Sequence, residues 1–175
     1  KADETWPHEV HCIGQETTGP GGFAKALRTV PVMLQIAEVV AERAKPDAWL
    51  IDFTNPVGIV TRALLQAGHR AVGLCNVAIG FQRRFAAVLG VQHDQVSLGH
   101  VGLNHLTWER SVTVDGVDRL PEMLGGGLAD IAEEVELPPA LLAQLGVVPS
   151  YYLRYYYAHD EALAEQLATP TRAEA

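Results

Sequence analysis

A thiol and an imidazole are the side chains of this sequence with the clearest potential for chemistry. Cys75 lies at the end of one short apolar run, and His105 follows a second segment further along the chain. A thiolate and a neutral imidazole are both good ligands for a divalent transition metal. Thirty residues separate the two, so spacing does not favour a shared metal over the alternative that each is a packing residue.

A group of tyrosines could supply a base. Five tyrosines and one arginine fall within PSYYLRYYY (149–157). A tyrosine beside a metal ion or another cation can act as a general base, because the cation favours the phenolate. One site needs one base, so most of the five must instead pack in a core or at a subunit contact.

A glycine-rich segment follows three polar side chains near the start of the chain. Gln15, Glu16 and Thr17 stand directly before a glycine-proline cluster at 19–22, where a helical pattern begins. Glycines at a helix start expose backbone N–H groups and let the main chain approach a ligand closely. An ordinary glycine-rich turn is the alternative.

The elements that must position these residues alternate between strand and helix. Asn55 and Cys75 follow two predicted strands, and in an open α/β sheet ligands bind at the carboxyl ends of the strands. Asn55 could instead cap the next helix. The predicted helices cover 22–44, with a kink or a break at Pro31, 57–67 and 79–89, and the predicted strands cover 48–53 and 70–77.

The pattern changes after residue 95. Apolar residues alternate over 96–103 and 106–114, and Asp115-Gly116 is a turn signal, so antiparallel strands are expected there. Residues 119–147 are predicted to be helical or irregular, interrupted by a triple glycine and a double proline.

Composition limits the partners and the compartment. The 175 residues carry a formal net charge of −8, which argues against nonspecific binding to nucleic acid or to an anionic membrane. No apolar run reaches the length of a membrane span. Two cysteines do not make a disulfide framework, so the cytoplasm is the expected location.

Five strings occur in a characteristic order: GQETTGPGGF (14–23), FTNP (53–56), GLCNV (73–77), GLNH (102–105) and PSYYLRYYY (149–157). The ordered set resembles the family 4 glycoside hydrolases, the phospho-glycosidases that depend on NAD and a divalent metal. Asn76, directly after Cys75, makes the chain similar to the 6-phospho-β-glucosidase branch, because the α-glucosidase branch has aspartate there.

The resemblance implies a fold and a mechanism. It implies an α/β chain in which 1–95 form the C-terminal part of a Rossmann-type, lactate/malate dehydrogenase-like domain and 96–175 the first part of an α+β substrate domain. NAD would oxidise the sugar at C3, and a metal, typically Mn²⁺, would polarise the resulting ketone. A tyrosine would then remove the C2 proton, the C1 group would leave, and water and the returned hydride would complete the hydrolysis of a 6-phospho-β-glucoside.

The resemblance also implies roles for individual residues. They are Cys75 and His105 as ligands of Mn²⁺ or another divalent metal, Tyr152 as the base, Glu16 as a second catalytic residue, Asn55, Asn76 and Asn104 as substrate contacts, and Gln15 and Thr17 as contacts near the NAD cofactor.

The sequence departs from the family pattern in several places. Asp52 stands where the family usually has asparagine, and Ala78 where it has proline. No glycine-rich dinucleotide fingerprint occurs. These 175 residues are therefore expected to be a middle segment, inactive or impaired alone, with an exposed sheet edge that favours a homo-oligomer.

Two other functions fit the same residues. A lactate- or malate-dehydrogenase relative would share the architecture and an Asn-Pro after a strand, but would use a histidine with an acidic partner and no metal. A noncatalytic module that binds a sugar phosphate would bind no NAD. A manganese requirement and NAD affinity separate these alternatives from the glycosidase.

Overall fold

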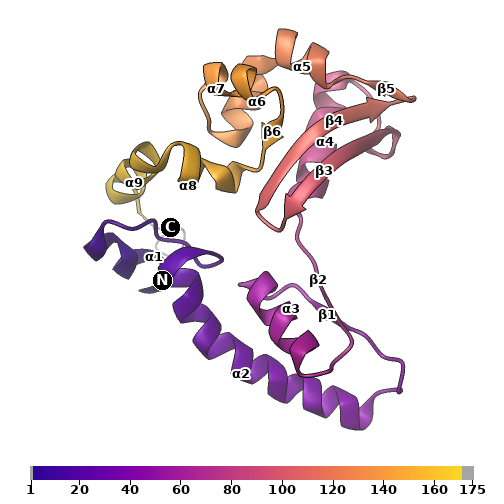
Figure 1. The fold of residues 1–175 in the computed structure, drawn as a ribbon, viewed down its shortest axis with the longest axis vertical. Helices are drawn as coiled ribbons and strands as arrows, with labels where there is room; N and C mark the ends of the chain where they lie inside the picture. Colours follow the sequence, from indigo (N-terminus) through magenta and orange to yellow (C-terminus); the bar gives the residue numbers. More distant parts are fainter. Residues whose placement is uncertain (1, 171–175) are drawn as a thin grey trace. The chain divides into compact units, whose positions relative to one another are not determined.

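The computed structural model describes residues 2–170, and the chain folds into two compact units (Figure 1). The first unit comprises Lys1–Cys75 and Asp160–Ala175, and the second comprises Asn76–His159. Within residues 2–170, no helix combines the length and apolar character needed to cross a membrane. The assignment of domains to 1–95 and 96–175 stays a prediction.

One long helix runs through the first unit. After α1 (Ala2–Thr5) and a 3₁₀ helix (Trp6–Val10), α2 extends over Gly19–Arg43 with Pro31 inside it. The expected break at Pro31 is wrong. Val30, Met33 and Leu34 pack against the core of this unit on both sides of the proline, and this packing holds the helix together despite the lost N–H.

A small parallel sheet is the centre of the first unit. β1 (Leu50–Asp52) pairs directly with β2 (Ala71–Gly73), and α3 (Val57–Gln66) connects the two strands, as the alternation of strand and helix predicts. The strands are shorter than predicted, and Asp52 contributes to this because its side chain accepts the N–H of Thr54 and turns the chain away from the ladder. The core beneath the sheet comprises Ala37, Val60, Leu64 and Ala71.

The two faces of this sheet differ in burial. Asp52 and Ala71 are buried on one face. Ile51 and Phe53 are 68% and 61% exposed, as alternate strand residues that point the other way. An exposed apolar sheet face is therefore present in the first unit.

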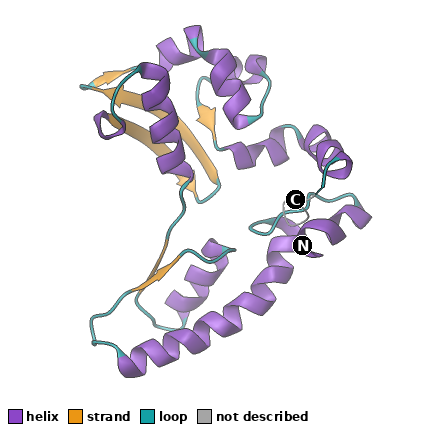
Figure 2. Ribbon diagram, turned by 180° about the vertical axis from the view of Figure 1, so that it is seen from behind, coloured by secondary structure: helices purple, strands orange, loops and turns teal. Residues whose placement is uncertain are grey.

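The second unit is built on an antiparallel sheet (Figure 2). β3 (Val96–Leu103) and β4 (Leu106–Val114) form the predicted hairpin, and β5 (Val117–Asp118) and β6 (Val148–Pro149) also pair with β4. On α4 (Val77–Leu89), which contacts β3, the rings of Phe81 and Phe85 stack 5.5 Å apart.

Short helices complete the fold, as predicted for the segment after residue 119. Their ends fall at the glycine and proline interruptions of the sequence. They are α5 (Leu120–Gly126), α6 (Leu128–Val135), α7 (Pro139–Leu145), a 3₁₀ turn (Tyr151–Leu153), α8 (Arg154–Tyr157) and α9 (His159–Ala168). The fold is α/β, as expected.

Candidate active site

His105 occupies the tip of the β3–β4 hairpin. The last residue pair of the ladder is Leu103 and Leu106, so Asn104 and His105 make a two-residue turn. His105 has a φ of 65°, the left-handed conformation that a two-residue hairpin turn favours. Its side chain is 8% exposed, whereas Asn104 is exposed.

The tyrosine segment is brought to this tip by the sheet. Pro149 pairs with Trp108, and the N–H of Ser150 donates to the carbonyl of Thr107 at 2.9 Å. The buried Ser150 then accepts the N–H of Tyr152 with its hydroxyl oxygen. The sequence PSYY thus leaves β6 in a turn that begins beside the hairpin.

Tyr152 and His105 are in direct contact. Their rings stack with centroids 3.6 Å apart and planes 9° from parallel. The expected base and one expected metal ligand therefore lie against each other, although 47 positions of chain separate residues 105 and 152.

Burial also sets the protonation of His105. Desolvation lowers the pKa of His105 below its ordinary value, because a buried imidazolium loses hydration. A neutral imidazole keeps the lone pair that metal coordination needs.

Two other tyrosine rings surround Tyr152. Tyr151 lies 4.4 Å from Tyr152 at a tilt of 30°, and Tyr155 meets it edge-on at 6.3 Å. The remaining pair, Tyr156 and Tyr157, form a separate edge-to-face contact at 5.3 Å. The expectation that most of the five pack in a core or at a subunit contact is not met by a core, because none of the five is buried and they contact one another instead.

Glu16 and Asn55, the expected acidic and substrate-binding residues, meet in the first unit. The amide of Asn55 donates to Glu16 at 3.0 Å, and Lys25 on α2 forms an ion pair with the other carboxylate oxygen. Glu16 thus links the end of β1 to the first turns of α2. The sequence analysis missed Lys25, although its place in the segment that follows the GQETT string offered a clue.

Gln15 and Thr17 bind each other. The carbonyl oxygen of the Gln15 side chain accepts both the N–H and the hydroxyl of Thr17, at 3.0 and 2.7 Å. Beside them, the glycines serve the chain's own packing. A Cβ on Gly14 would lie 1.8 Å from the carbonyl oxygen of Glu4, and one on Gly21 would lie 2.0 Å from that of Asp3. Among the described residues, Gly14 and Gly21 thus let two segments of this chain's own backbone approach each other closely.

Asn55 and Cys75 follow neighbouring strand ends. The parallel register sets Asp52 opposite Gly73, so the chain leaves both strands at the same edge of the sheet. Cys75 carries a partly exposed side chain. Asn76 is exposed and directly precedes α4.

Asp52 is a residue whose importance the sequence analysis underestimated. It is buried, and its two carboxylate oxygens accept from the Thr54 N–H at 2.8 Å and from the Thr61 hydroxyl at 3.5 Å. It therefore shapes the turn that carries Asn55. A carboxylate inside an apolar run, two residues before a threonine, is the sequence signal for such a turn.

Glu109 is a second residue that the sequence analysis missed. Its carboxylate is fully buried and lies 2.6 Å from Nδ1 of His100 on the facing strand. Burial raises the pKa of Glu109, and the contact with His100 opposes that rise. The sequence offers no signal for it, because position 109 is out of phase with the apolar residues at 106, 108, 112 and 114.

The residues fit a metal in their chemistry but contribute few ligands. Within residues 2–170, no three histidine, cysteine or acidic side chains gather as a metal site. Cys75 and His105 supply one thiol and one neutral imidazole, from different units.

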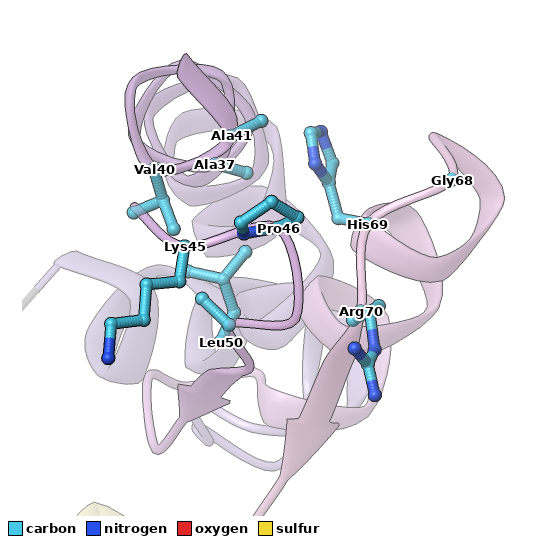
Figure 3. A pocket seen from close by; sticks show the side chains of 10 residues that line it. Ala37, Val40, Ala41, Lys45, Pro46, Leu50, Gly68, His69 and Arg70 are labelled. Carbon is cyan, nitrogen blue, oxygen red and sulfur yellow. The ribbon is translucent and has the colours of Figure 1, made fainter. Parts of the chain in front are cut away.

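A hollow of about 250 Å³ lies at the opposite end of the small sheet (Figure 3). It is lined by the last turns of α2, by Leu50 at the start of β1 and by His69 and Arg70 before β2. Lys45 and Arg70 extend in different directions rather than toward a common point. Arg70 also stacks 4.8 Å from Trp49, so this hollow has no converging groups that would bind an anion.

The chain matches two family descriptions, one in each half. Residues 1–91 match "Family 4 glycosyl hydrolase", and residues 100–175 match "Family 4 glycosyl hydrolase C-terminal domain". A probable 6-phospho-beta-glucosidase of Bacillus subtilis is 41% identical over 94% of this chain and 39% of its own length. A 6-phospho-beta-glucosidase of Escherichia coli is 36% identical over the same shares.

Solved structures agree with this match. The 6-phospho-beta glucosidase of Thermotoga maritima, with manganese, NAD⁺ and glucose-6-phosphate, superposes with a TM-score of 0.85 at 30% identity, over 98% of this chain and 42% of that one. This chain thus spans about two-fifths of the length of the relatives it matches. By its sequence and its fold, the chain belongs to family 4 of the glycosyl hydrolases.

Proposed function

We propose that this chain carries part of the active site of an NAD- and divalent-metal-dependent 6-phospho-β-glucosidase. The observation that carries the proposal is the stacking of His105 on Tyr152, with ring centroids 3.6 Å apart. Family membership and the named relatives support the substrate class, because the 6-phospho-beta-glucosidases of two bacteria cover 94% of the chain.

In this proposal Tyr152 removes a proton from C2 of the sugar. When bound, NAD and a divalent cation such as Mn²⁺ supply a reversible oxidation of the sugar and the polarisation of the carbonyl that results. His105 and Cys75 would hold the cation. A neutral His105 suits this role, because it offers a lone pair to a cation that would favour the phenolate of Tyr152, the form that accepts the proton.

The first unit would hold the sugar and the cofactor. Glu16 and Asn55 are already joined by a hydrogen bond, so together they offer carboxylate and amide groups to sugar hydroxyls. From the second unit, Asn76 and Asn104 are exposed amides that would also bind the sugar. Gln15 and Thr17 would border the NAD, and the restraint that each places on the other keeps the loop ordered.

Metal binding tests the ligands directly. Titration of Mn²⁺, followed by the EPR signal of the free ion, should show an affinity at least about 10-fold lower in Cys75→Ser and in His105→Asn. Asparagine is chosen because it tolerates the left-handed backbone found at position 105. The matched controls are Cys12→Ser, at another partly exposed cysteine, and His93→Ala, at an exposed imidazole of the unit that holds His105. Equal affinity in all five proteins would refute the ligand assignment.

Isotope incorporation tests the base. Hydrolysis of a 6-phospho-β-glucoside in D₂O should place deuterium at C2 of the product, because the proton passes through a base that exchanges with solvent. Tyr152→Phe should lose both hydrolysis and exchange, whereas Tyr156→Phe, on an exposed ring outside the stack, should keep both. Hydrolysis without deuterium at C2 would contradict this role of Tyr152.

The other expectations stay predictions. Family membership favours the glycosidase over a dehydrogenase-like oxidoreductase. A noncatalytic module that binds sugar phosphate is favoured instead if the chain binds glucose 6-phosphate but no NAD at millimolar concentration. A homo-oligomer, which sedimentation velocity would detect, and a cytoplasmic location complete the proposal.

A further inference from the structure

An aromatic surface extends from the proposed base toward solvent. Tyr151 remains 37% exposed although its ring lies 4.4 Å from that of Tyr152. The other two rings around Tyr152 are less exposed, because His105 is buried and Tyr155 is half-buried. Tyr151 is thus the most exposed aromatic surface in direct contact with Tyr152.

The chemistry of the proposed site determines what reaches this ring. If Tyr152 takes the proton from C2, the leaving group sits on C1, one bond away, and must lie within a few ångströms of the Tyr152 hydroxyl. In the proposed function, His105 would hold the metal. The exposed ring of Tyr151 is then the neighbouring side chain that is best placed to touch the leaving group.

Apolar side chains at the hairpin end suit the same partner. Leu103 and Leu106 are a directly opposed pair on either side of the Asn104-His105 turn, and both are exposed. An aryl group would bury apolar surface against such side chains and could stack on Tyr151, whereas a methyl group offers neither contact.

We propose that Tyr151 is a specificity residue that favours 6-phospho-β-glucosides with an aromatic leaving group. This inference rests on the proposed function, because it places the leaving group beside Tyr152. Tyr151 plays no part in proton transfer, so its removal should change the choice of substrate and not the reaction.

The experiment compares phenyl β-D-glucoside 6-phosphate with methyl β-D-glucoside 6-phosphate. The measured quantity is the ratio of kcat/KM for the phenyl compound to kcat/KM for the methyl compound, in the protein and in each variant. Dividing the variant's ratio by the protein's ratio cancels the intrinsic difference between the leaving groups. Tyr151→Ser should lower the ratio about 2- to 10-fold, the range expected from one aromatic pair.

Two controls separate the ring from other effects. Tyr151→Phe keeps the ring and should keep the ratio. Tyr156→Ser removes a tyrosine that is more exposed than Tyr151 and that packs with Tyr157 instead of Tyr152, so it should also keep the ratio. An unchanged ratio in Tyr151→Ser, with both compounds still hydrolysed, overturns the inference and leaves the proposed function standing.

If these 175 residues hydrolyse neither compound alone, as expected of a middle segment, equilibrium binding decides the inference. Isothermal titration of the same two compounds should then show a phenyl preference that Tyr151→Ser lowers and Tyr151→Phe retains. Equal binding of the two compounds overturns it.

Discussion

The two units hold their candidate site residues in different ways. In the first unit, Glu16 is fixed by polar contacts with Asn55 and Lys25, on side chains that are partly open to solvent. In the second unit, His105 is buried and stacked on Tyr152 at the end of a hairpin. Solvent weakens polar contacts but not packing of this kind. Substitutions should therefore be costly in the second unit and milder in the first, away from its core.

The two sheets show the same contrast. The inward residues of β4 include Val112 and Val114, which are buried under the helices of the second unit. The small parallel sheet of the first unit buries one face only and leaves Ile51 and Phe53 exposed. Two phenylalanines, buried Phe85 in the second unit and exposed Phe53 in the first, can therefore measure how much burial contributes to stability.

The largest expected effect comes from that pair. Phe85→Ala, in the core of the second unit, should destabilise it by about 3–5 kcal/mol, because it removes a buried ring and leaves a cavity. Phe53→Ala, on the exposed sheet face, should change stability by no more than about 0.5 kcal/mol. Amide hydrogen exchange, read separately for each unit, measures both. Similar losses for the two would show that the exposed face of the small sheet is covered in solution.

A smaller loss is expected from a polar residue of the first unit. Asp52→Ala should cost about 1–3 kcal/mol, because the N–H of Thr54 loses its charged acceptor in a part-buried hydrogen bond. Asp52→Asn should restore most of this stability, since the amide oxygen can accept the same hydrogen bond. Urea unfolding of the three proteins measures the difference. If asparagine is as damaging as alanine, the charge and not the hydrogen bond matters.

The hairpin and the contact between His105 and Tyr152 show how far sequence reasoning reaches. The hairpin of residues 96–114 was predictable, because alternating apolar residues and local turns are written in neighbouring positions. The contact between His105 and Tyr152 was not predictable from spacing, since it depends on β6 pairing with β4 across a long segment. Without the family resemblance, the sequence could name both residues but not bring them together.

Long-range pairing also explains the missed residues. Glu109 becomes notable only when His100 faces it across the hairpin and the helices cover it. Lys25 matters because the fold brings Glu16, nine positions earlier in the chain, against it. In each case the residue type was visible, but the partner was set by tertiary structure.

The pH dependence of stability should differ between two glutamates of the second unit. The pKa of buried Glu109 is raised, so the folded state binds its proton more tightly than the unfolded state does. The stability that this proton contributes therefore falls as pH rises from about 4.5 through the raised pKa. The pKa of exposed Glu122 is lowered by a hydrogen bond from Arg119, so its contribution is lost as pH falls through the lowered pKa. Thermal melts from about pH 3 to 8 of Glu109→Gln and Glu122→Gln should therefore deviate from the parent in opposite directions, below about pH 4.5 for Glu122 and above it for Glu109. Deviations of the same sign would mean that Glu109 is solvated in solution.

The smallest effect is expected at the ion pair of the first unit. Lys25→Ala removes the cation beside Glu16, and because both side chains are partly exposed the loss of stability should be below about 1 kcal/mol. The pair is screened by salt, so the difference between variant and parent should shrink further between 0.05 and about 1 M NaCl. The hydrogen bond between Asn55 and Glu16 should survive, because it joins the other carboxylate oxygen. Lys25→Ala and Lys25→Gln should consequently melt within about 2 °C of each other. If Lys25→Ala instead loses as much stability as Asp52→Ala, the residues around Glu16 are as well packed as the hairpin of the second unit.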